Sequence, residues 1–309
     1  MRPKSRGFSE TRRIRLQRAI IPVLLLAVLA SVILYVLLRN SEAVLPDTEN
    51  DQIQKEWDAQ NYEQVAALTG AKLLDEPLNS RNLLYNGIAN FYYALTLVNQ
   101  DEREGHLNSS IHSLRKLLYD PPAGFQQTIW YILGKAYFHK GPYYYDLSEK
   151  YLSLAEDSGF TADDILEYLG VIHLDYGEID SGISYIRQAI QNSPRAVLFL
   201  TIAEAYEEQG NTGEALEYYE EALNRSEDSF LRQEASLGKG RTLFRMEEFD
   251  RAQEIFEAII DRNSQSAQAY FYLGEIFAEA GDMVKARAQW REAYNQDRTF
   301  RPALERLQS

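Results

Sequence analysis

One pattern of small and large residues returns at a fixed interval along much of this chain. Ala252 and Ala286 are 34 residues apart, and each is followed four residues later by a large aromatic residue, Phe256 or Trp290. Residues three or four positions apart share one face of a helix. A period of this length indicates helix pairs that cannot bury their apolar faces alone. The pattern therefore predicts an all-α array in which each helix pair packs on the next.

The first helix of each pair resembles that of the tetratricopeptide repeat. Residues 130–137 read WYILGKAY, which has the form W-x2-L-G-x2-Y, and Tyr270, Leu273, Gly274 and Phe277 keep nearly the same pattern in the last copy. The resemblance implies a superhelical stack of about seven units with a concave groove that binds other proteins. Small residues such as Gly134 are expected where the two helices of a pair approach closely.

The register of the pattern sets the predicted boundaries of the array, which covers residues 46–300. Two less regular units come first, and in the second of them Asn86 and Asn90 stand at places that are usually apolar. Terminal repeats are often atypical because they cap the stack. Residues 301–309 are expected to form a partial capping helix. The predicted units are 46–79, 80–122, 127–162, 163–195, 196–229, 233–266 and 267–300.

A second feature, at residues 19–38, predicts a transmembrane helix. This segment reads AIIPVLLLAVLASVILYVLL and has no charged residue. Twenty helical residues span roughly 30 Å, the thickness of the hydrocarbon core of a bilayer. A cleaved signal peptide is the main alternative. We favour an uncleaved anchor, because the best small-residue site, at Ala30, is followed by eight more mostly apolar residues.

The charges around this segment predict its orientation. Seven basic residues precede it, whereas Arg39 is followed by acids. The positive-inside rule places the basic arm, residues 1–18, in the cytoplasm and the array outside, in the periplasm if the organism is a bacterium. A short linker, residues 39–50, joins the two. The chain is thus expected to be a single-pass membrane protein.

The charge balance and the residue types argue against several classes of function. Residues 1–39 carry a net charge of +7 within a total of −14, so the remainder carries −21 and should repel nucleic acid. The chain has no Cys, and its four His have no H-E-x-x-H spacing. Residues 238–242, GKGRT, resemble a phosphate-binding loop only superficially. We expect no catalytic residue, cofactor or metal, and Glu204, Glu207 and Glu208 are expected on a solvated helix face.

The groove that the resemblance implies is lined by fixed positions of each first helix. Several of these positions hold large apolar residues, which need a partner if they are exposed. A bound peptide is one interpretation; a tightly curled stack that covers some of them itself is the other. The turn at Tyr143–Tyr145 is either a partner contact or packed on its neighbours. The predicted groove residues are Leu84, Phe91, Tyr131, Lys135, Phe138, Leu200, Leu237, Arg241, Phe244 and Phe271.

Together these features favour a membrane-anchored scaffold or adaptor that assembles envelope proteins. A chaperone-like binder of exported or unfolded clients at the membrane surface is the alternative, and an enzyme is not expected. A scaffold should hold one or a few partners, whereas a chaperone should bind many unfolded chains weakly. The preference for the scaffold rests on the resemblance, since a fold does not by itself imply a function.

Overall fold

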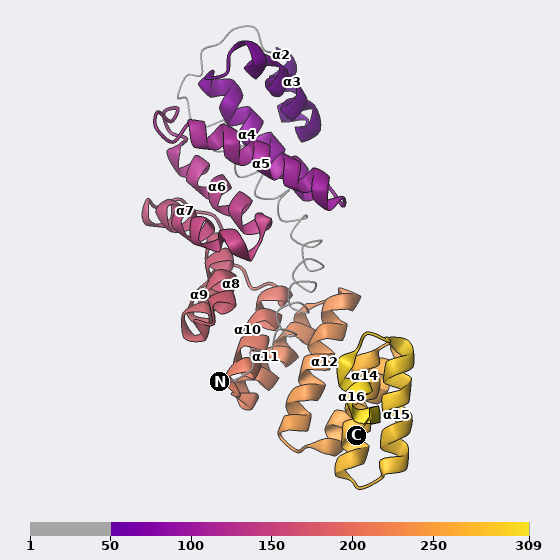
Figure 1. Cartoon of the computed structure of the whole chain (residues 1–309). Coiled ribbons are helices and arrows are strands. Elements are labelled where there is room, and N and C mark those ends of the chain that lie inside the picture. The colour runs from indigo at the N-terminus through magenta and orange to yellow at the C-terminus, as the bar shows by residue number, and fades with distance from the viewer. Residues whose placement is uncertain (1–50, 309) are drawn as a thin grey trace, which may run out of the picture. The chain divides into compact units, whose positions relative to one another are not determined.

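The structure, a computed structural model, describes residues 51–308, and every regular element in this range is helical (Figure 1). The prediction of an all-α chain is confirmed for these residues. The predicted basic arm, transmembrane helix and linker lie wholly outside them. None of the described helices is both long and apolar enough to cross a bilayer.

The helices follow one another in pairs joined by short turns. The first unit holds α2 (Asp51–Asp58), α3 (Tyr62–Asp75), α4 (Ser80–Thr96), α5 (Gln100–Lys116), α6 (Gln126–Lys140), the 3-10 turn η1 (Pro142–Tyr144), α7 (Tyr145–Asp157) and α8 (Ile165–Tyr176). The second unit holds α9 (Ile179–Asn192), α10 (Ala196–Gln209), α11 (Thr212–Arg225), α12 (Ser229–Arg245), α13 (Phe249–Arg262), α14 (Ala267–Glu279), α15 (Met283–Gln296) and α16 (Arg301–Gln308).

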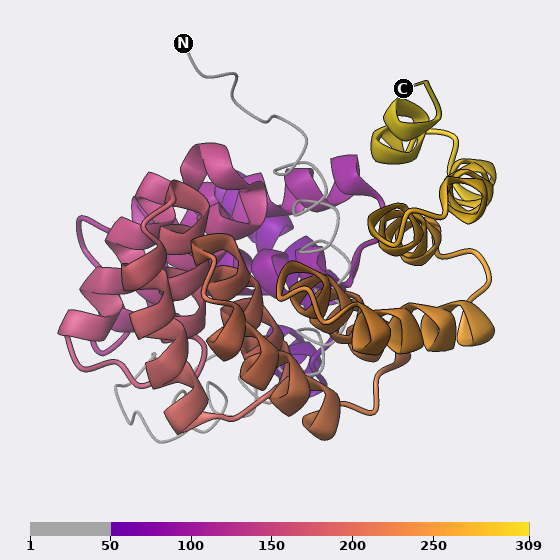
Figure 2. The same ribbon diagram turned by 90° about the horizontal axis from the view of Figure 1, so that it is seen from below.

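The chain divides into two compact units between Tyr176 and Gly177, and each is described by itself. In unit 1, α4 packs on α3 and α5, and α6 packs on α7. In unit 2, the pairs α10–α11, α12–α13 and α14–α15 pack in the same way, and α16 covers α15. Figure 2 shows the orange and yellow helices of unit 2 following one another as separate ribbons. The division falls within predicted unit 163–195, in the turn between α8 and α9.

Small residues let the two helices of a pair approach closely, as the pattern predicts. At Gly134 of α6, a Cβ atom would lie 2.6 Å from Cγ of Leu152 and 3.0 Å from its backbone nitrogen on α7. Ser148 of α7 donates a hydrogen bond to the Gly134 carbonyl at 2.8 Å. The backbones are therefore in direct contact at this point, which a larger side chain would separate.

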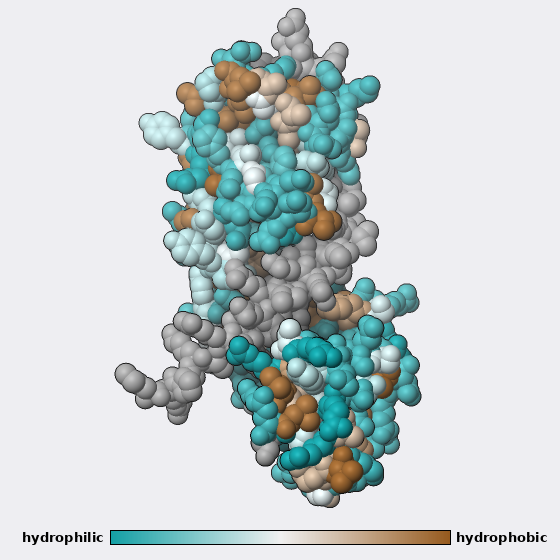
Figure 3. Space-filling view, turned by 45° about the vertical axis from the view of Figure 1, so that its right-hand side comes forward, coloured by the Kyte–Doolittle hydropathy of each residue, from teal (hydrophilic) through white to brown (hydrophobic). Residues whose placement is uncertain are grey.

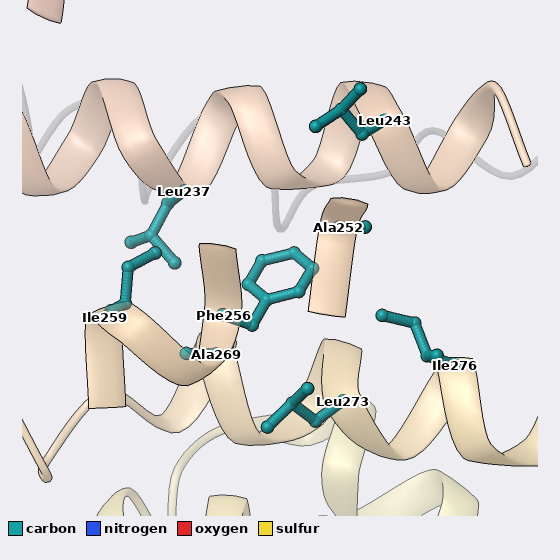
Figure 4. Packing of buried hydrophobic residues seen from close by; sticks show 8 residues of the cluster. All are labelled: Leu237, Leu243, Ala252, Phe256, Ile259, Ala269, Leu273 and Ile276. Atoms are coloured by element: carbon teal, nitrogen blue, oxygen red, sulfur yellow. The ribbon is translucent and has the colours of Figure 1, made fainter. Parts of the chain in front are cut away.

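The core of unit 2 is continuous through three consecutive helices. Figure 4 shows Phe256 of α13 between side chains of α12 and α14. Its ring stacks on that of Tyr272, with centroids 5.2 Å apart and planes 8° from parallel. Each helix pair thus completes its apolar core only with its neighbour, as a stacked array requires. The cluster consists of Leu237, Leu243, Ala252, Phe256, Ile259, Ala269, Leu273 and Ile276.

Unit 1 contains a buried polar network where the repeat pattern is least regular. The Asn86 side-chain amide donates to the Ala66 carbonyl and to Oγ1 of Thr69 on α3, at 3.1 and 3.0 Å. Its oxygen accepts from Ser113 Oγ on α5 at 2.8 Å. Asn90 donates to the Asn86 carbonyl. The two asparagines at usually apolar places are therefore buried and hydrogen-bonded, and Asn86 connects α4 to both neighbouring helices.

Replacement of Asn86 by Ala is expected to lower the free energy of unfolding by about 1–3 kcal/mol, because it leaves the buried Ser113 hydroxyl without its acceptor. Urea unfolding of the full chain followed by circular dichroism measures the change. Ser109→Ala is the control, since that exposed hydroxyl bonds only to the Gly105 carbonyl one turn earlier. Equal stability of the Asn86 variant and the control would show that the network adds nothing.

Candidate functional site

The first helices of successive pairs contact one another and form one face of each unit. In unit 1 this first-helix face comes from α4, α6 and α8, and in unit 2 from α10, α12 and α14. These are the helices on which the predicted groove residues lie. The two faces differ in how much of them is accessible, so they are described in turn.

Most of the predicted groove residues are buried. The first-helix face of unit 1 buries all five of its predicted residues, and unit 2 buries two more. Arg241, Phe244 and Phe271, all in unit 2, stay partly accessible. The second interpretation, that the stack covers part of its own groove, therefore describes most of these positions. A partner role for them stays a prediction. The seven buried residues are Leu84, Phe91, Tyr131, Lys135, Phe138, Leu200 and Leu237.

Lys135 is a buried cation surrounded by aromatic rings. Its side chain is 2% exposed, and Nζ lies 4.8 Å from the ring centroid of Tyr131, 5.3 Å from that of Tyr168 and 5.6 Å from that of Phe91. Nζ donates to Asp164 Oδ2 at 2.7 Å and to the Tyr131 hydroxyl at 2.9 Å. The Tyr131 hydroxyl donates to the other Asp164 oxygen at 2.7 Å. Lys135 therefore ties α6 to the start of α8 within unit 1.

Two substitutions separate the charge of Lys135 from its packing. Lys135→Met keeps most of the side-chain volume and should cost about 1 kcal/mol, because Asp164 is 21% exposed and water can replace the ammonium group. Lys135→Ala should cost about 2 kcal/mol more, because it also leaves a cavity among the three rings. Thermal unfolding of both variants provides the comparison. Equal losses of stability in the two variants would show that packing around the aliphatic part of the Lys135 side chain does not stabilise the fold.

His139 packs beside this cation as a neutral ring. Its burial, with a smaller contribution from the charge of Lys135, lowers the pKa of His139 to about 3. The ring lies 5.6 Å from that of Phe138 and 5.9 Å from that of Tyr168. His139 is therefore uncharged at neutral pH and serves as part of the aromatic packing.

The first-helix face of unit 2 is organised around a buried carboxylate, Glu207, which the sequence places on a solvated face. That expectation is wrong. Arg241 of α12 donates to its two oxygens from Nε at 3.0 Å and from Nη2 at 2.8 Å. The Tyr219 hydroxyl of α11 also donates to Glu207. A bidentate guanidinium–carboxylate pair with a third donor is a strong charge-assisted arrangement.

The balance of effects at Glu207 favours its charged form. Burial by itself raises the pKa of Glu207, but the hydrogen bonds and charge of Arg241, with smaller effects of Tyr219 and Arg245, lower it below its ordinary value of 4.5. Arg245, on the next turn of α12, donates to the Glu207 carbonyl at 3.0 Å, and its side chain is 46% exposed. One arginine is thus used in the core, and the second reaches solvent.

The same cluster explains the glycine-rich stretch at residues 238–242. A Cβ atom on Gly238 would lie 2.2 Å from the Tyr219 ring, which is fully buried and held by its bond to Glu207. Gly238 lies within α12, not in a loop before a helix. Its place is therefore set by packing against Tyr219, and the resemblance to a phosphate-binding loop has no structural counterpart.

Beside the arginines lies a row of aromatic rings that are only partly buried. The ring of Phe244 is 5.9 Å from that of Tyr272, Tyr272 is 5.4 Å from Phe271, and Phe271 is 5.5 Å from Phe300. We call Phe244, Tyr272, Phe271 and Phe300 the aromatic row. All four are intermediate in exposure. The row connects α12 and α14 to the residue before α16, and it contains two of the three accessible predicted residues.

The aromatic turn of unit 1 combines both interpretations that the sequence leaves open. The Tyr145 ring is buried and stacks on Phe138 at 5.1 Å. Tyr144 stacks on Tyr137 at 6.1 Å, whereas Tyr143 is 87% exposed. On the face of the molecule seen in Figure 3, hydrophilic teal areas separate the brown hydrophobic ones. Tyr143 is therefore the exposed ring of this turn, and its only ring contact among the described residues is with Tyr144, at 5.1 Å.

Comparison with known proteins identifies the repeats. Tetratricopeptide-repeat family models match residues 196–229 and 237–299. The chain contains tetratricopeptide repeats. The matched residues include α10–α11 and most of the α12–α15 segment, which carries every residue of the aromatic row except Phe300. A comparison with curated protein sequences gave no significant match. No group of His, Asp and Glu arranged to hold a metal occurs among the described residues.

Several solved structures share the fold. The C-terminal part of a TPR repeat-containing protein from Cytophaga hutchinsonii has a TM-score of 0.62 and 16% identity, with 82% of this chain and 98% of that one covered. A chain of the APC/C hetero-tetramer Cut9–Hcn1 has a TM-score of 0.54 and 12% identity over 83% of this chain and 47% of that one. MamA has a TM-score of 0.50 and 18% identity, with coverages of 57% and 93%. At these identities the likeness shows the fold alone.

Proposed function

We propose that this chain is a membrane-anchored adaptor that holds a partner protein on the first-helix face of unit 2. The repeat fold is of the protein-interaction scaffold type. The observation that carries the proposal is the aromatic row beside Arg245, because it places partly accessible rings next to an arginine whose side chain is 46% exposed. Aromatic residues and arginine are enriched at the centres of protein interfaces.

The chemistry of this site favours a particular kind of partner segment. The rings of Phe244 and Phe271 can take apolar side chains of a peptide. Arg245 can pair with a carboxylate on the same peptide through the nitrogens that do not contact Glu207, since its side chain is 46% exposed. The partner segment is therefore an amphipathic helix or an extended peptide with apolar residues and at least one acid. The described face of unit 1 offers no equivalent site, because its predicted groove residues are buried.

Recovery of the partner with charge-reversed variants tests this site. The tagged full chain is purified from cells of its own organism, and bound proteins are quantified by mass spectrometry. Arg245→Glu should reduce recovery of the partner at least tenfold. Arg262→Glu, an exposed arginine at the end of α13, makes the same charge change elsewhere and should leave recovery unchanged. Equal recovery with both variants would exclude Arg245 from the site.

The membrane part of the proposal rests on the composition of residues 19–38. Because the chain has no cysteine, single cysteines placed at Ser5 and Ser41 can be labelled separately in intact cells with a membrane-impermeant thiol reagent. The proposed orientation predicts labelling at position 41 and none at position 5 until the membrane is opened. Labelling at position 5 of intact cells would reverse the orientation, and recovery of the chain in the soluble fraction would exclude the anchor.

A further inference from the structure

The outer surface of α13 carries a stripe of acids. Asp250, Glu254, Glu257 and Asp261 are all exposed and are spaced four, three and four residues apart. This spacing places them on one face of the helix. The buried residues of α13, Ala252, Phe256 and Ile259, lie on the opposite face. The stripe therefore points away from the core of unit 2, and we call it the α13 stripe.

The equivalent helix of the next pair has the opposite charge. The 34-residue period matches the α13 stripe to Val284, Ala288, Arg291 and Asn295 of α15, none of which is an acid. Arg287 flanks Arg291 one turn earlier, and both are exposed. Neither forms an ion pair with any other residue in the described part of the chain. Arg287 and Arg291, the α15 pair, are thus uncompensated cations on an otherwise acidic unit.

We propose that the outer face of α13 and α15 binds a second copy of this chain through a two-fold axis. Successive helix pairs of an array differ by a small rotation, so equivalent helices present their outer faces to the same side. A two-fold interface uses the same surface on both copies and must be complementary to itself. An acidic stripe next to a basic pair meets this condition, because α13 of each copy can face α15 of the other.

Charge complementarity selects a second copy over other acidic partners. Away from the α15 pair, unit 2 is strongly acidic, and α11 carries Glu214, Glu217, Glu220 and Glu221. If an unrelated polyanion bound to Arg287 and Arg291, the neighbouring acids of the α13 stripe would repel it. In the two-fold arrangement, the α13 stripe of each copy faces the α15 pair of the other copy, so each charged group is opposite a group of the other sign. Exposed Val284 and Ala288 add apolar area between the charges.

Reciprocal charge reversal tests the proposal on the full chain. Two differently tagged copies are co-expressed, solubilised in mild detergent and purified on one tag, and the ratio of the tags is measured. The wild-type copies should co-purify in about 0.1 M salt and separate in about 1 M salt, where the screening length falls from ~10 to ~3 Å. Arg287→Glu/Arg291→Glu paired with itself, and Glu254→Arg/Glu257→Arg paired with itself, should each lower co-purification at least tenfold.

The mixture of the two variants gives the decisive result. In this mixture, one tagged copy has the two arginines reversed and the other has the two glutamates reversed. Each contact between α13 of one copy and α15 of the other then joins opposite charges again, so co-purification should return to the wild-type level. Glu214→Arg/Glu217→Arg, the same charge change on α11, should leave wild-type pairing intact. Unchanged pairing of either reversed variant with itself, failure of the mixture to recover, or no wild-type pairing at low salt would each overturn the proposal. Thermal unfolding of every variant checks that it is folded.

Discussion

Replacing Glu207 with Ala is expected to lower the free energy of unfolding by about 3–5 kcal/mol, because it leaves Arg241, whose side chain is only 14% exposed, without its bidentate partner. Tyr219 would lose its acceptor in the same step. Urea unfolding of the full chain followed by far-ultraviolet circular dichroism measures the loss. Glu217→Ala, an exposed acid on α11, is the control and should change stability by less than about 0.5 kcal/mol.

The ion pair of Glu207 and Arg241 should also make the free energy of unfolding depend on pH, in a direction that the pKa of Glu207 determines. The pKa of Glu207 in the folded protein lies below its ordinary value of 4.5. Its contribution to stability is therefore complete above about pH 4.5 and is lost as the pH falls through the lower, folded-state value. Wild type should lose stability in this range faster than Glu207→Gln, which cannot titrate. Parallel stability curves for the two proteins between neutral pH and pH 3 would contradict the assigned ion pair.

Replacing Phe256 with Ala should also cost about 3–5 kcal/mol, because the ring is fully buried between α12 and α14 and its removal leaves a large cavity. The stacking with Tyr272 would be lost as well, which should loosen the aromatic row. Phe256→Leu is the matched control, since it keeps most of the volume and should cost under about 1.5 kcal/mol. Thermal and urea unfolding check both variants. A loss from Ala no larger than that from Leu would show that the core relaxes around the missing ring.

The repeat spacing was sufficient to predict how the helices pack. Ala252, Phe256, Ala286 and Trp290 stand at the positions that define the period, and all four are buried. Gly134, expected at a close approach, lies directly against Leu152. These features depend on residues a few positions apart within one helix or one pair. A one-dimensional pattern contains that information, because each unit contacts only its neighbours.

The candidate site depended on contacts that the pattern does not contain. In the sequence, Glu207 is one of several acids on a helix. Only the structure shows that it is a buried charge bonded to Arg241, 34 residues later. The resemblance assigns Lys135 to the groove, but Phe91 and Tyr168 from other helices enclose its side chain. Which side chains of successive first helices meet is set by the rotation between repeats. The spacing of residues along the chain does not specify that rotation closely enough.

The aromatic row was only partly predictable for the same reason. Phe244 and Phe271 occupy positions that the resemblance assigns to the groove, whereas Tyr272 and Phe300 do not. Phe300 joins the row because α16 follows it and packs on α15. Arg306 of α16 also pairs with Glu275 through two hydrogen bonds, from Nε at 2.9 Å and from Nη2. The last helix therefore helps to form the face of α14, beyond its expected role as a cap.

The most direct test of the account is photocrosslinking in living cells of the organism that makes this protein. A photoreactive amino acid replaces Phe271 in the aromatic row, with Tyr143 in the exposed turn of unit 1 as the comparison, and crosslinked proteins are identified by mass spectrometry. The account predicts one dominant partner crosslinked from position 271 and far less of it from position 143. Many exported proteins crosslinked weakly from position 271 would instead indicate the chaperone-like alternative. No crosslinked protein at position 271 would contradict the assignment of the aromatic row as the binding site.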